Sequence, residues 1–319
     1  MSPEPGAPLV TVGVPTFNRA AMLQRAVESA LAQEGVSLEV VISDNASTDG
    51  TAELCRRLAE ADGRVRVLTQ DHNIGAHANL RAVLDAASAP HFAWLADDDW
   101  LGPGALRACL DVLSRRPDHS LVAPAVEYFG VAGELALEEP PVNAASRRPG
   151  ARVAQYFATL TRNGVFYGVA HTDRLRAAPF PPTIAGDWHL VAALAAAGPI
   201  RTLPDVQLNR TLGPSEDPVA TAVAHGASGL RSRQQHLWIA AALLSDIAWR
   251  APAFRRLGPA PRRAFVGGAA AAVVFGRFSL QVWLIQGLRA ARLLPLARVL
   301  KSAFANRGAG AGSRSASES

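Results

Sequence analysis

The chain has 319 residues, of which 49% are hydrophobic and 18% charged, and this composition excludes a disordered protein. The formal net charge is +5, and the two cysteines are too few for a disulfide framework, so we expect buried thiols in a reducing compartment. The first residues contain no basic region followed by an apolar core, and they predict no secretory signal.

Strand and helix signals alternate through the first third of the chain. Short apolar runs predict strands, and segments with apolar residues at helical spacing predict helices. We expect strands at 9–14, 38–42, 65–68 and 91–96, and helices at 20–33, 51–61 and 75–87. This order predicts an α/β fold, Rossmann-like, with a mostly parallel sheet flanked by helices. Ligands bind such sheets at the carboxyl ends of the strands.

The pattern is less regular after residue 102. We expect helices at 104–115, 152–162 and 187–197, a strand at 121–129, and loops at 134–150 and 210–227. From residue 230 onward the signal is helical. We therefore divide the chain into a flexible N-terminus (1–8), a catalytic domain (9–228), a helical, basic C-terminal region (229–305) and a disordered tail (306–319).

The C-terminal region has an unusual charge pattern. No acidic residue occurs from Ile247 to Ser317, while arginines recur throughout that stretch. Its apolar run, residues 264–275, is interrupted by Arg277 and is shorter than the roughly 20 residues that span a bilayer. Two interpretations stay open for this region: peripheral contact with an anionic membrane surface, and a helical subdomain or dimer contact.

Polar clusters follow the first two predicted strands. Pro15, Thr16 and Phe17 form a turn that can offer backbone groups and an aromatic face to a nucleotide base, although Asn18 can equally cap the next helix. Asp44 ends the second strand, where it can accept a hydrogen bond from a base N–H. The acids and hydroxyls after it fit a helix cap.

A third cluster follows the third strand. Asn73 and Gly75 fit a tight turn. Arg81, in the helix that follows, would place a positive charge within reach of a diphosphate, or it lies at the surface. Both interpretations of Arg81 stay open.

The fourth cluster is the run Asp97–Asp98–Asp99, directly after an apolar strand. Three adjacent carboxylates repel one another, so the run needs solvent or a cation. Mg²⁺ and Mn²⁺ prefer carboxylate and phosphate oxygens, so the run predicts a metal that bridges the protein to a diphosphate. The competing interpretation is an acidic helix start before Gly102 and Pro103.

In this order and spacing, the four clusters resemble the family-2 glycosyltransferases of the GT-A fold, strongly over residues 9–113 and more weakly over 163–215. The resemblance implies a nucleotide-diphosphate-sugar donor, a divalent metal (Mn²⁺ or Mg²⁺) and inversion at the anomeric carbon. Asp98 is expected as the principal metal ligand with Asp97 and Asp99 supporting it; in the alternative register, Asp97 and Asp99 themselves form the Asp-X-Asp pair. The residues expected at the donor nucleotide are Pro15, Thr16, Phe17, Asp44, Arg81 and Asp97, and those expected at the metal are Asp98 and Asp99.

The resemblance also implies a catalytic base, because an inverting transfer must remove a proton from the acceptor hydroxyl. Asp187 matches the position of that acid at the start of a helix, where its alternative role is an N-cap. Many relatives carry an Arg-X-His segment nearby, whose His helps to hold the metal. Here Leu212 takes that place, so the metal shell rests on fewer ligands or on His225, and Arg210 is expected to contact the diphosphate.

The sequence thus predicts a cytoplasmic inverting glycosyltransferase, free or peripheral at the inner membrane face, that acts on a sugar, lipid-linked or small-metabolite acceptor and not on nucleic acid. A nucleotidyltransferase of similar fold is the first alternative, but such enzymes usually have a Gly-rich loop after the first strand, and residues 14–19 contain no glycine. A non-catalytic, membrane-associated scaffold is the second, against which the acids at 44, 97–99 and 187 argue.

Overall fold

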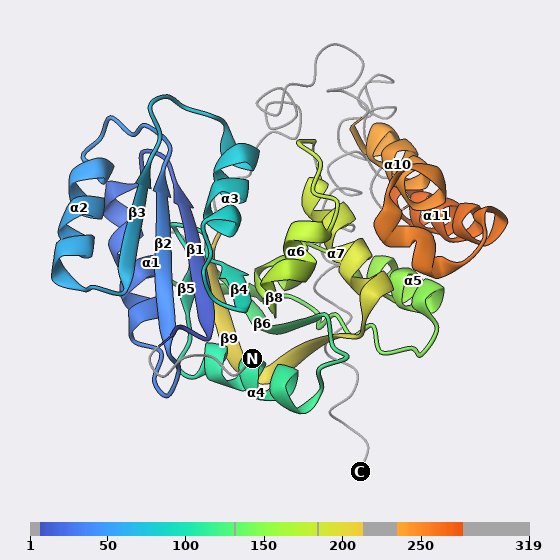
Figure 1. The fold of residues 1–319 in the computed structure, drawn as a ribbon, viewed down its shortest axis with the longest axis horizontal. Helices are drawn as coiled ribbons and strands as arrows, with labels where there is room; N and C mark the ends of the chain where they lie inside the picture. The colour runs from blue at the N-terminus through green and yellow to red at the C-terminus, as the bar shows by residue number, and fades with distance from the viewer. Residues whose placement is uncertain (1–6, 131, 184, 213–234, 277–319) are drawn as a thin grey trace, which may run out of the picture.

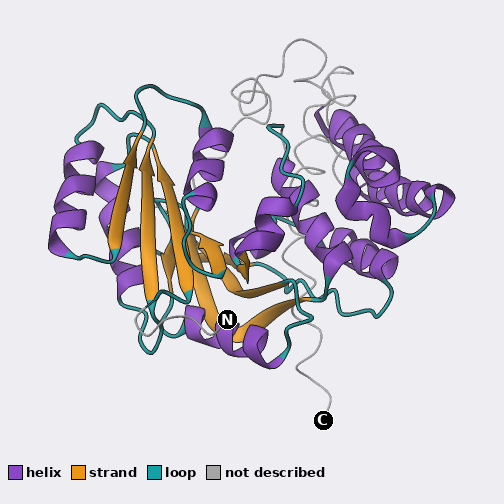
Figure 2. Cartoon of the chain, in the orientation of Figure 1, coloured by secondary structure: helices purple, strands orange, loops and turns teal. Residues whose placement is uncertain are grey.

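A computed structural model describes residues 7–130, 132–183, 185–212 and 235–276. It contains one mixed sheet in the order β3-β2-β1-β4-β8-β6-β9-β5, with β7 paired to β6. Helices cover the sheet, and further helices extend beyond it on one side (Figures 1 and 2). Several predictions lie outside the described residues: most of the flexible N-terminus and of the 210–227 loop, His225, the C-terminal region beyond 276, and the disordered tail.

The first half of the sheet is parallel, as the alternating pattern predicts. It consists of β1 (Val10–Thr16), β2 (Leu38–Asp44), β3 (Val65–Thr69) and β4 (His91–Trp94). Helices α1 (Ala20–Leu31) and α2 (Thr51–Ala61) cover one face, and α3 (Ala76–Asp85) covers the other (Figure 1). Every residue of β2 is buried, which is typical of a strand with helices on both sides.

The second half of the sheet contains both parallel and antiparallel pairs. Strand β8 (Val169–His171) runs antiparallel to β4 and to β6 (Leu121–Phe129). Strand β9 (Ile200–Thr211) runs parallel to β6 and antiparallel to β5 (Trp100–Leu101).

The sequence did not predict β9, because Pro204 interrupts its pattern at the point where the register with β6 shifts. The prediction of a loop over 134–150 is wrong at β7 (Leu135–Glu138), a short strand at the sheet edge whose side chains are mostly exposed.

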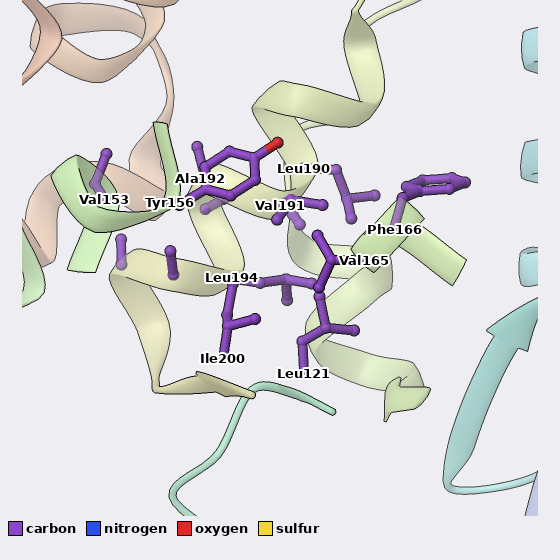
Figure 3. Packing of buried hydrophobic residues seen from close by; sticks show 14 of the residues in the cluster. Leu121, Val153, Tyr156, Val165, Phe166, Leu190, Val191, Ala192, Leu194 and Ile200 are labelled. Atoms are coloured by element: carbon purple, nitrogen blue, oxygen red, sulfur yellow. The ribbon is translucent and has the colours of Figure 1, made fainter. Parts of the chain in front are cut away.

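The remaining described helices are α4 (Ala105–Arg115), α5 (Pro149–Thr159), α6 (Thr172–Ala177), α7 (Gly186–Ala197), α10 (Gln235–Ser245) and α11 (Ala260–Val274), with the short turns η1 (Gly164–Tyr167), η2 (Asp246–Arg250) and η3 (Pro252–Leu257). Helix α11 packs against α10, α5 and η2. Helix α7 is buried along nearly its whole length, as an Ala- and Leu-rich helix must be. Figure 3 shows its residues Leu190 and Leu194 beside Val165 and Ile200.

The C-terminal helices belong to the same hydrophobic cluster as α5 and α7. Leu243, Phe254 and Val266 are buried in that cluster together with Leu190. Gly267 of α11 allows a close approach to α10, because an added Cβ would lie 3.2 Å from the Leu244 side chain. The helical extension is confirmed for residues 235–276. The division at 228/229 falls among residues that are not described and stays a prediction.

No helix within the described residues is long and apolar enough to cross a membrane.

Candidate active site

The carboxyl ends of β1, β2 and β4 lie side by side at one edge of the sheet. Thr16 pairs with Asp44 across β1 and β2, and Gly13 pairs with Trp94 across β1 and β4. The acidic run therefore begins at the same level as Thr16. A cavity of about 470 Å³ opens at this edge, and its lining includes Pro15, Thr16, Phe17, Asn79, Asp97 and Tyr167.

The three aspartates of the run have three different environments. Asp97 lines the cavity, and burial is the main cause that raises its pKa to about 6. The Thr16 hydroxyl opposes this rise, as does Arg19, whose Nε lies 4.0 Å from Asp97 Oδ1. The adjacent Asp98 repels the Asp97 charge and raises its pKa further.

Asp98 is held by its backbone, and its carboxylate is left unpaired. The Asp98 carbonyl accepts hydrogen bonds from Arg25 Nη2 at 2.7 Å and from the Thr211 hydroxyl at 2.6 Å. Within the described part of the chain, no hydrogen bond or ion pair engages the carboxylate itself. The backbone of Asp98 is thus fixed, while its side chain stays available to a ligand.

The Asp99 carboxylate is paired with other groups of the protein. Its side chain is 1% exposed, accepts a hydrogen bond from Arg210 Nε at 2.7 Å, and accepts another from the Thr211 N–H at 3.0 Å. Burial raises the pKa of Asp99 to about 6, and Arg210 opposes that rise. Arg210 also donates to the Tyr167 hydroxyl at 3.2 Å and lies over its ring. Two residues expected at the metal and the diphosphate therefore contact each other.

This geometry limits how a metal can bind. Among the described residues, no three His, Cys, Asp or Glu side chains come together as a complete site. Leu212 packs against a hydrophobic cluster of the sheet. The unpaired Asp98 and the neighbouring Asp97 do fit a cation whose remaining ligands are substrate phosphates and water, the usual arrangement for Mg²⁺.

The other residues predicted at the nucleotide lie at different depths. Phe17 is 40% exposed beside the cavity, whereas Asp44 is 1% exposed and accepts a hydrogen bond from the Ser47 N–H at 3.2 Å. Asn45, next to Asp44, is in the cavity lining. Arg81 pairs with Asp85 on the surface of α3 and does not line the cavity.

Asparagines join the loops around the cavity. Asn18 does not cap α1; its side chain accepts a hydrogen bond from the Thr48 N–H of the second loop at 2.8 Å. Asn79 of α3 donates to the carbonyls of Thr16 and Ser43, so one amide connects the ends of β1 and β2. Its own oxygen has no hydrogen-bond partner among the described residues. Beyond its place in a predicted helix, no sequence pattern marks Asn79.

Asp187 lies at the first turn of α7, where it is half-buried. Asn163 Nδ2 donates to Asp187 Oδ2 at 2.6 Å. Burial raises the pKa of Asp187, while Asn163 and the N–H groups at the helix start oppose this rise. Burial also raises the pKa of Tyr167 to about 12, and Asp99, Asp187 and Asp98 each add to it. Tyr167 thus lies within electrostatic range of both the acidic run and Asp187.

A second contact joins the start of α7 to the C-terminal helices. His189 is fully buried, with Nδ1 3.1 Å from the Ala185 carbonyl and Nε2 3.3 Å from Asp246 Oδ2. Ala185, directly before α7, has a φ of 61°, a left-handed conformation that is costly for alanine. No sequence pattern predicts the contacts of His189, Asn163 and Tyr167, because each contacts a partner distant in the chain.

Comparison with known proteins identifies the family. Residues 11–169 match the model of glycosyl transferase family 2. The chain is 38% identical over 100 residues to a Campylobacter jejuni GalNAc(5)-diNAcBac-PP-undecaprenol beta-1,3-glucosyltransferase, covering 31% of this chain and 32% of that protein. It is 40% identical over 104 residues to the Rhizobium meliloti succinoglycan biosynthesis protein ExoO, covering 33% and 29%. The chain belongs to glycosyl transferase family 2.

Solved structures support the fold of this family-2 chain. TarS of S. aureus in complex with UDP-GlcNAc matches with a TM-score of 0.53 at 17% identity, covering 92% of this chain and 87% of that one. A Pyrobaculum calidifontis mannosyltransferase in complex with GDP-Man and Mn²⁺ matches with a TM-score of 0.54 at 20% identity, covering 93% and 84%. The GT-A prediction is confirmed. The two curated relatives match over only about a third of their own length.

Proposed function

We propose that this chain transfers a sugar from a nucleoside diphosphate sugar to an acceptor hydroxyl, with inversion at the anomeric carbon. The observation that carries the proposal is the arrangement around Tyr167, which lines the cavity beside Asp97 and also lies within electrostatic range of Asp187. A tyrosine within range of both the acidic run and Asp187 indicates that the donor site and the base are close enough to act on one sugar.

In the proposed reaction, Asp187 takes the proton of the acceptor hydroxyl as the acceptor oxygen bonds to the anomeric carbon. The bond from that carbon to the diphosphate oxygen breaks, and the nucleoside diphosphate leaves with the electron pair. Burial raises the pKa of Asp187, which makes it a stronger base than an ordinary aspartate. A metal bound at Asp98, with Asp97 beside it, would neutralise charge on the leaving diphosphate.

Each donor-side residue has a role in this proposal. Thr16, Phe17 and Asn45 would contact the nucleoside, because they line the cavity at the ends of β1 and β2. Asp44 would act from beneath them, since it is buried at the adjacent position. Arg19 lines the cavity and lies 4.0 Å from Asp97, so it is better placed for the diphosphate than Arg81 or Arg210.

A binding titration tests the proposal. Calorimetry with UDP and with GDP, each with and without Mn²⁺, should show binding of at least one nucleotide that Mn²⁺ strengthens. Asp98→Asn should remove the effect of Mn²⁺. Binding of neither nucleotide would contradict the donor site, and equal binding with and without Mn²⁺ would contradict the metal.

We also propose that the C-terminal helices place the enzyme at the cytoplasmic face of an anionic membrane, where lipid-linked acceptors lie. Phe265 and Trp249 are 78% and 64% exposed, and the exposed Arg255, Arg256 and Arg262 lie nearby in the chain. Aromatic and cationic side chains together suit an anionic lipid surface. Sedimentation with vesicles of phosphatidylglycerol, compared with phosphatidylcholine, tests this. Equal binding of Phe265→Ser and wild type would contradict the membrane role.

A further inference from the structure

Two buried side chains from different elements form a hydrogen-bonded series behind the candidate base. The Tyr156 hydroxyl of α5 donates to Asn163 Oδ1 at 2.9 Å, and Asn163 Nδ2 donates to Asp187 Oδ2 at 2.6 Å. Tyr156 and Asn163 are 0% and 1% exposed. A donor that lies 2.6 Å from a carboxylate oxygen forms a strong charge-assisted hydrogen bond.

Tyr156, the first residue in this series of hydrogen bonds, determines the orientation of the Asn163 amide. An asparagine amide has one oxygen that accepts and one nitrogen that donates. Burial raises the pKa of Tyr156 far above its usual value, and nearby Asp187 and Glu139 raise it further, so the hydroxyl keeps its proton. Tyr156 therefore holds the amide oxygen on its own side and turns the amide nitrogen toward Asp187.

The backbone around Asn163 is held as firmly as its side chain. Asn163 has a φ of 60°, a left-handed conformation that asparagine adopts more readily than most residues. Its carbonyl accepts a hydrogen bond from the Phe166 N–H at 3.0 Å and begins η1. On either side, the N–H groups of Arg162 and Gly164 donate to the buried Glu139 carboxylate. The amide cannot easily move away from Asp187.

We propose that Asn163 and Tyr156 are positioning residues that hold the Asp187 carboxylate in one orientation and favour its ionised form. This inference rests on the proposed role of Asp187 as base. Burial by itself would drive Asp187 toward the protonated form, which cannot accept a proton from the acceptor. The Asn163 hydrogen bond stabilises the charged form within the same buried setting, so the base is both ionisable and fixed in direction.

The titratable groups that face Asp187 leave few other sources of pH dependence. They are Tyr156 from α5, Tyr167 from η1, and His189 from α7 itself, whose charge would lower the pKa of Asp187. Both tyrosines titrate in the alkaline range. Asp246 of η2 acts through its contact with His189. The Asp187→Asn variant shows which part of a pH effect depends on the Asp187 carboxylate.

The test is a double-mutant cycle in unfolding free energy, measured with urea from mildly acidic to mildly alkaline pH. The four proteins are wild type, Asn163→Gly, Asp187→Asn and the double variant. Glycine keeps the left-handed backbone and removes only the amide. Because the amide stabilises the charged carboxylate, its loss raises the pKa of Asp187. The cost of Asn163→Gly is then full above the raised pKa of the variant, shrinks as pH falls, and loses its charge-dependent part below the wild-type pKa, where both proteins are protonated.

We expect Asn163→Gly to weaken the folding equilibrium on the order of tenfold more at alkaline than at acidic pH, as for the loss of a hydrogen bond to a charged group. In the Asp187→Asn background this pH dependence should disappear. The same loss at every pH, or a pH dependence that persists without Asp187, would overturn the inference. Should Asn163→Gly not fold, Tyr156→Phe takes its place in the cycle and should show a smaller effect of the same sign.

A matched asparagine outside the site provides the control. Asn143 accepts a hydrogen bond from the Thr202 N–H at 3.1 Å, and Asn143→Ala should lower stability equally at all pH values. The cycle reports on the free protein and needs no substrate, so it separates this inference from the proposed function. If Asp187→Asn keeps its transfer activity, the base role fails whatever the cycle shows. If it is inactive and the cycle shows no pH dependence, only the positioning role fails.

Discussion

The two walls of the candidate site are built in different ways. The donor wall consists of loops at the ends of β1, β2 and β4, and its hydrogen bonds join one loop to the next, as between Asn18 and Thr48. The base wall combines Tyr156 of α5, Asn163 before η1 and Asp187 of α7, with His189 in contact with Asp246 of the C-terminal helices. The strand order of the sheet brings the donor-wall residues together. The base-wall residues come together only when helices pack against one another.

The walls also differ in whether their carboxylates already have partners within the protein. Asp98 has a fixed backbone and an unpaired side chain within the described part of the chain, so it is open to a cation and a diphosphate. Asp187 is half-buried and already accepts a hydrogen bond from Asn163. Asp98 would therefore gain its partners only when a cation and a diphosphate bind, whereas Asp187 has a hydrogen-bond partner before the substrate arrives.

The largest effect should come from the base wall. Asp187→Asn should lower transfer by roughly 10²–10⁴-fold, the usual contribution of a general base, because an amide cannot take the acceptor proton. Nucleotide affinity should stay at the wild-type value. Transfer rates and calorimetric titration of the same preparation measure both. If the variant lost nucleotide binding together with transfer, the base and the donor site would not act independently, contrary to our account.

Breaking the Asp99–Arg210 pair should have the next largest effect, a loss of folding stability. Arg210→Met leaves the nearly buried Asp99 without its cation and should cost about 3–5 kcal/mol of unfolding free energy. Arg81→Met, which breaks the exposed pair with Asp85, should cost at most about 1 kcal/mol. Urea denaturation of both variants gives the comparison. Equal costs would mean that Asp99 is not held as the structure shows.

Gly186 tests how tightly the base wall is packed. A Cβ at this position would lie 2.2 Å from the Pro181 carbonyl oxygen, so Gly186→Ala must move the backbone next to Asp187. We expect a loss of about 1–3 kcal/mol and a lower transfer rate. Gly268→Ala is the control, because nothing lies within 4 Å of its added methyl and helix α11 should gain about 0.5–1 kcal/mol. Thermal unfolding and turnover report both.

The smallest effects should come from two alanines in left-handed conformation, one in each wall. Ala46 follows β2 and Ala185 precedes α7, and both have a φ of 61°. Glycine at either position should stabilise the protein by about 1 kcal/mol, since it carries no Cβ penalty there. Ala192→Gly within buried α7 should instead lower stability. A loss of stability at Ala46→Gly or Ala185→Gly would show that the methyl group packs usefully.

The sequence predicted which polar residues gather at the carboxyl edge of the sheet, because they directly follow strands. A β-α-β pattern places such ends at one edge, and the positions of Thr16 and Asp97 therefore followed from the pattern. It did not predict that Arg210 would pair with Asp99, since the two residues are separated by 111 positions and β9 was missed at Pro204. Arg81 had the right charge and helix, but its side chain pairs with Asp85.

The base wall was predicted only at Asp187, and there through family resemblance. Asn163 and Tyr156 have no local pattern, because their spacing in the chain does not reveal that α5 and α7 pack together. The same limit applies to Asp246, whose role depends on the C-terminal helices joining the cluster around α7. Hydrogen bonds between helices distant in the chain need the folded structure.

The affinity for a nucleoside diphosphate, measured by calorimetry with and without Mn²⁺ in wild type, Asp98→Asn and Asp187→Asn, tests the separation of the two walls most directly. Our account predicts that Mn²⁺ strengthens binding in wild type and in Asp187→Asn but not in Asp98→Asn. A metal effect that survives in Asp98→Asn, or one that disappears in Asp187→Asn, would contradict it.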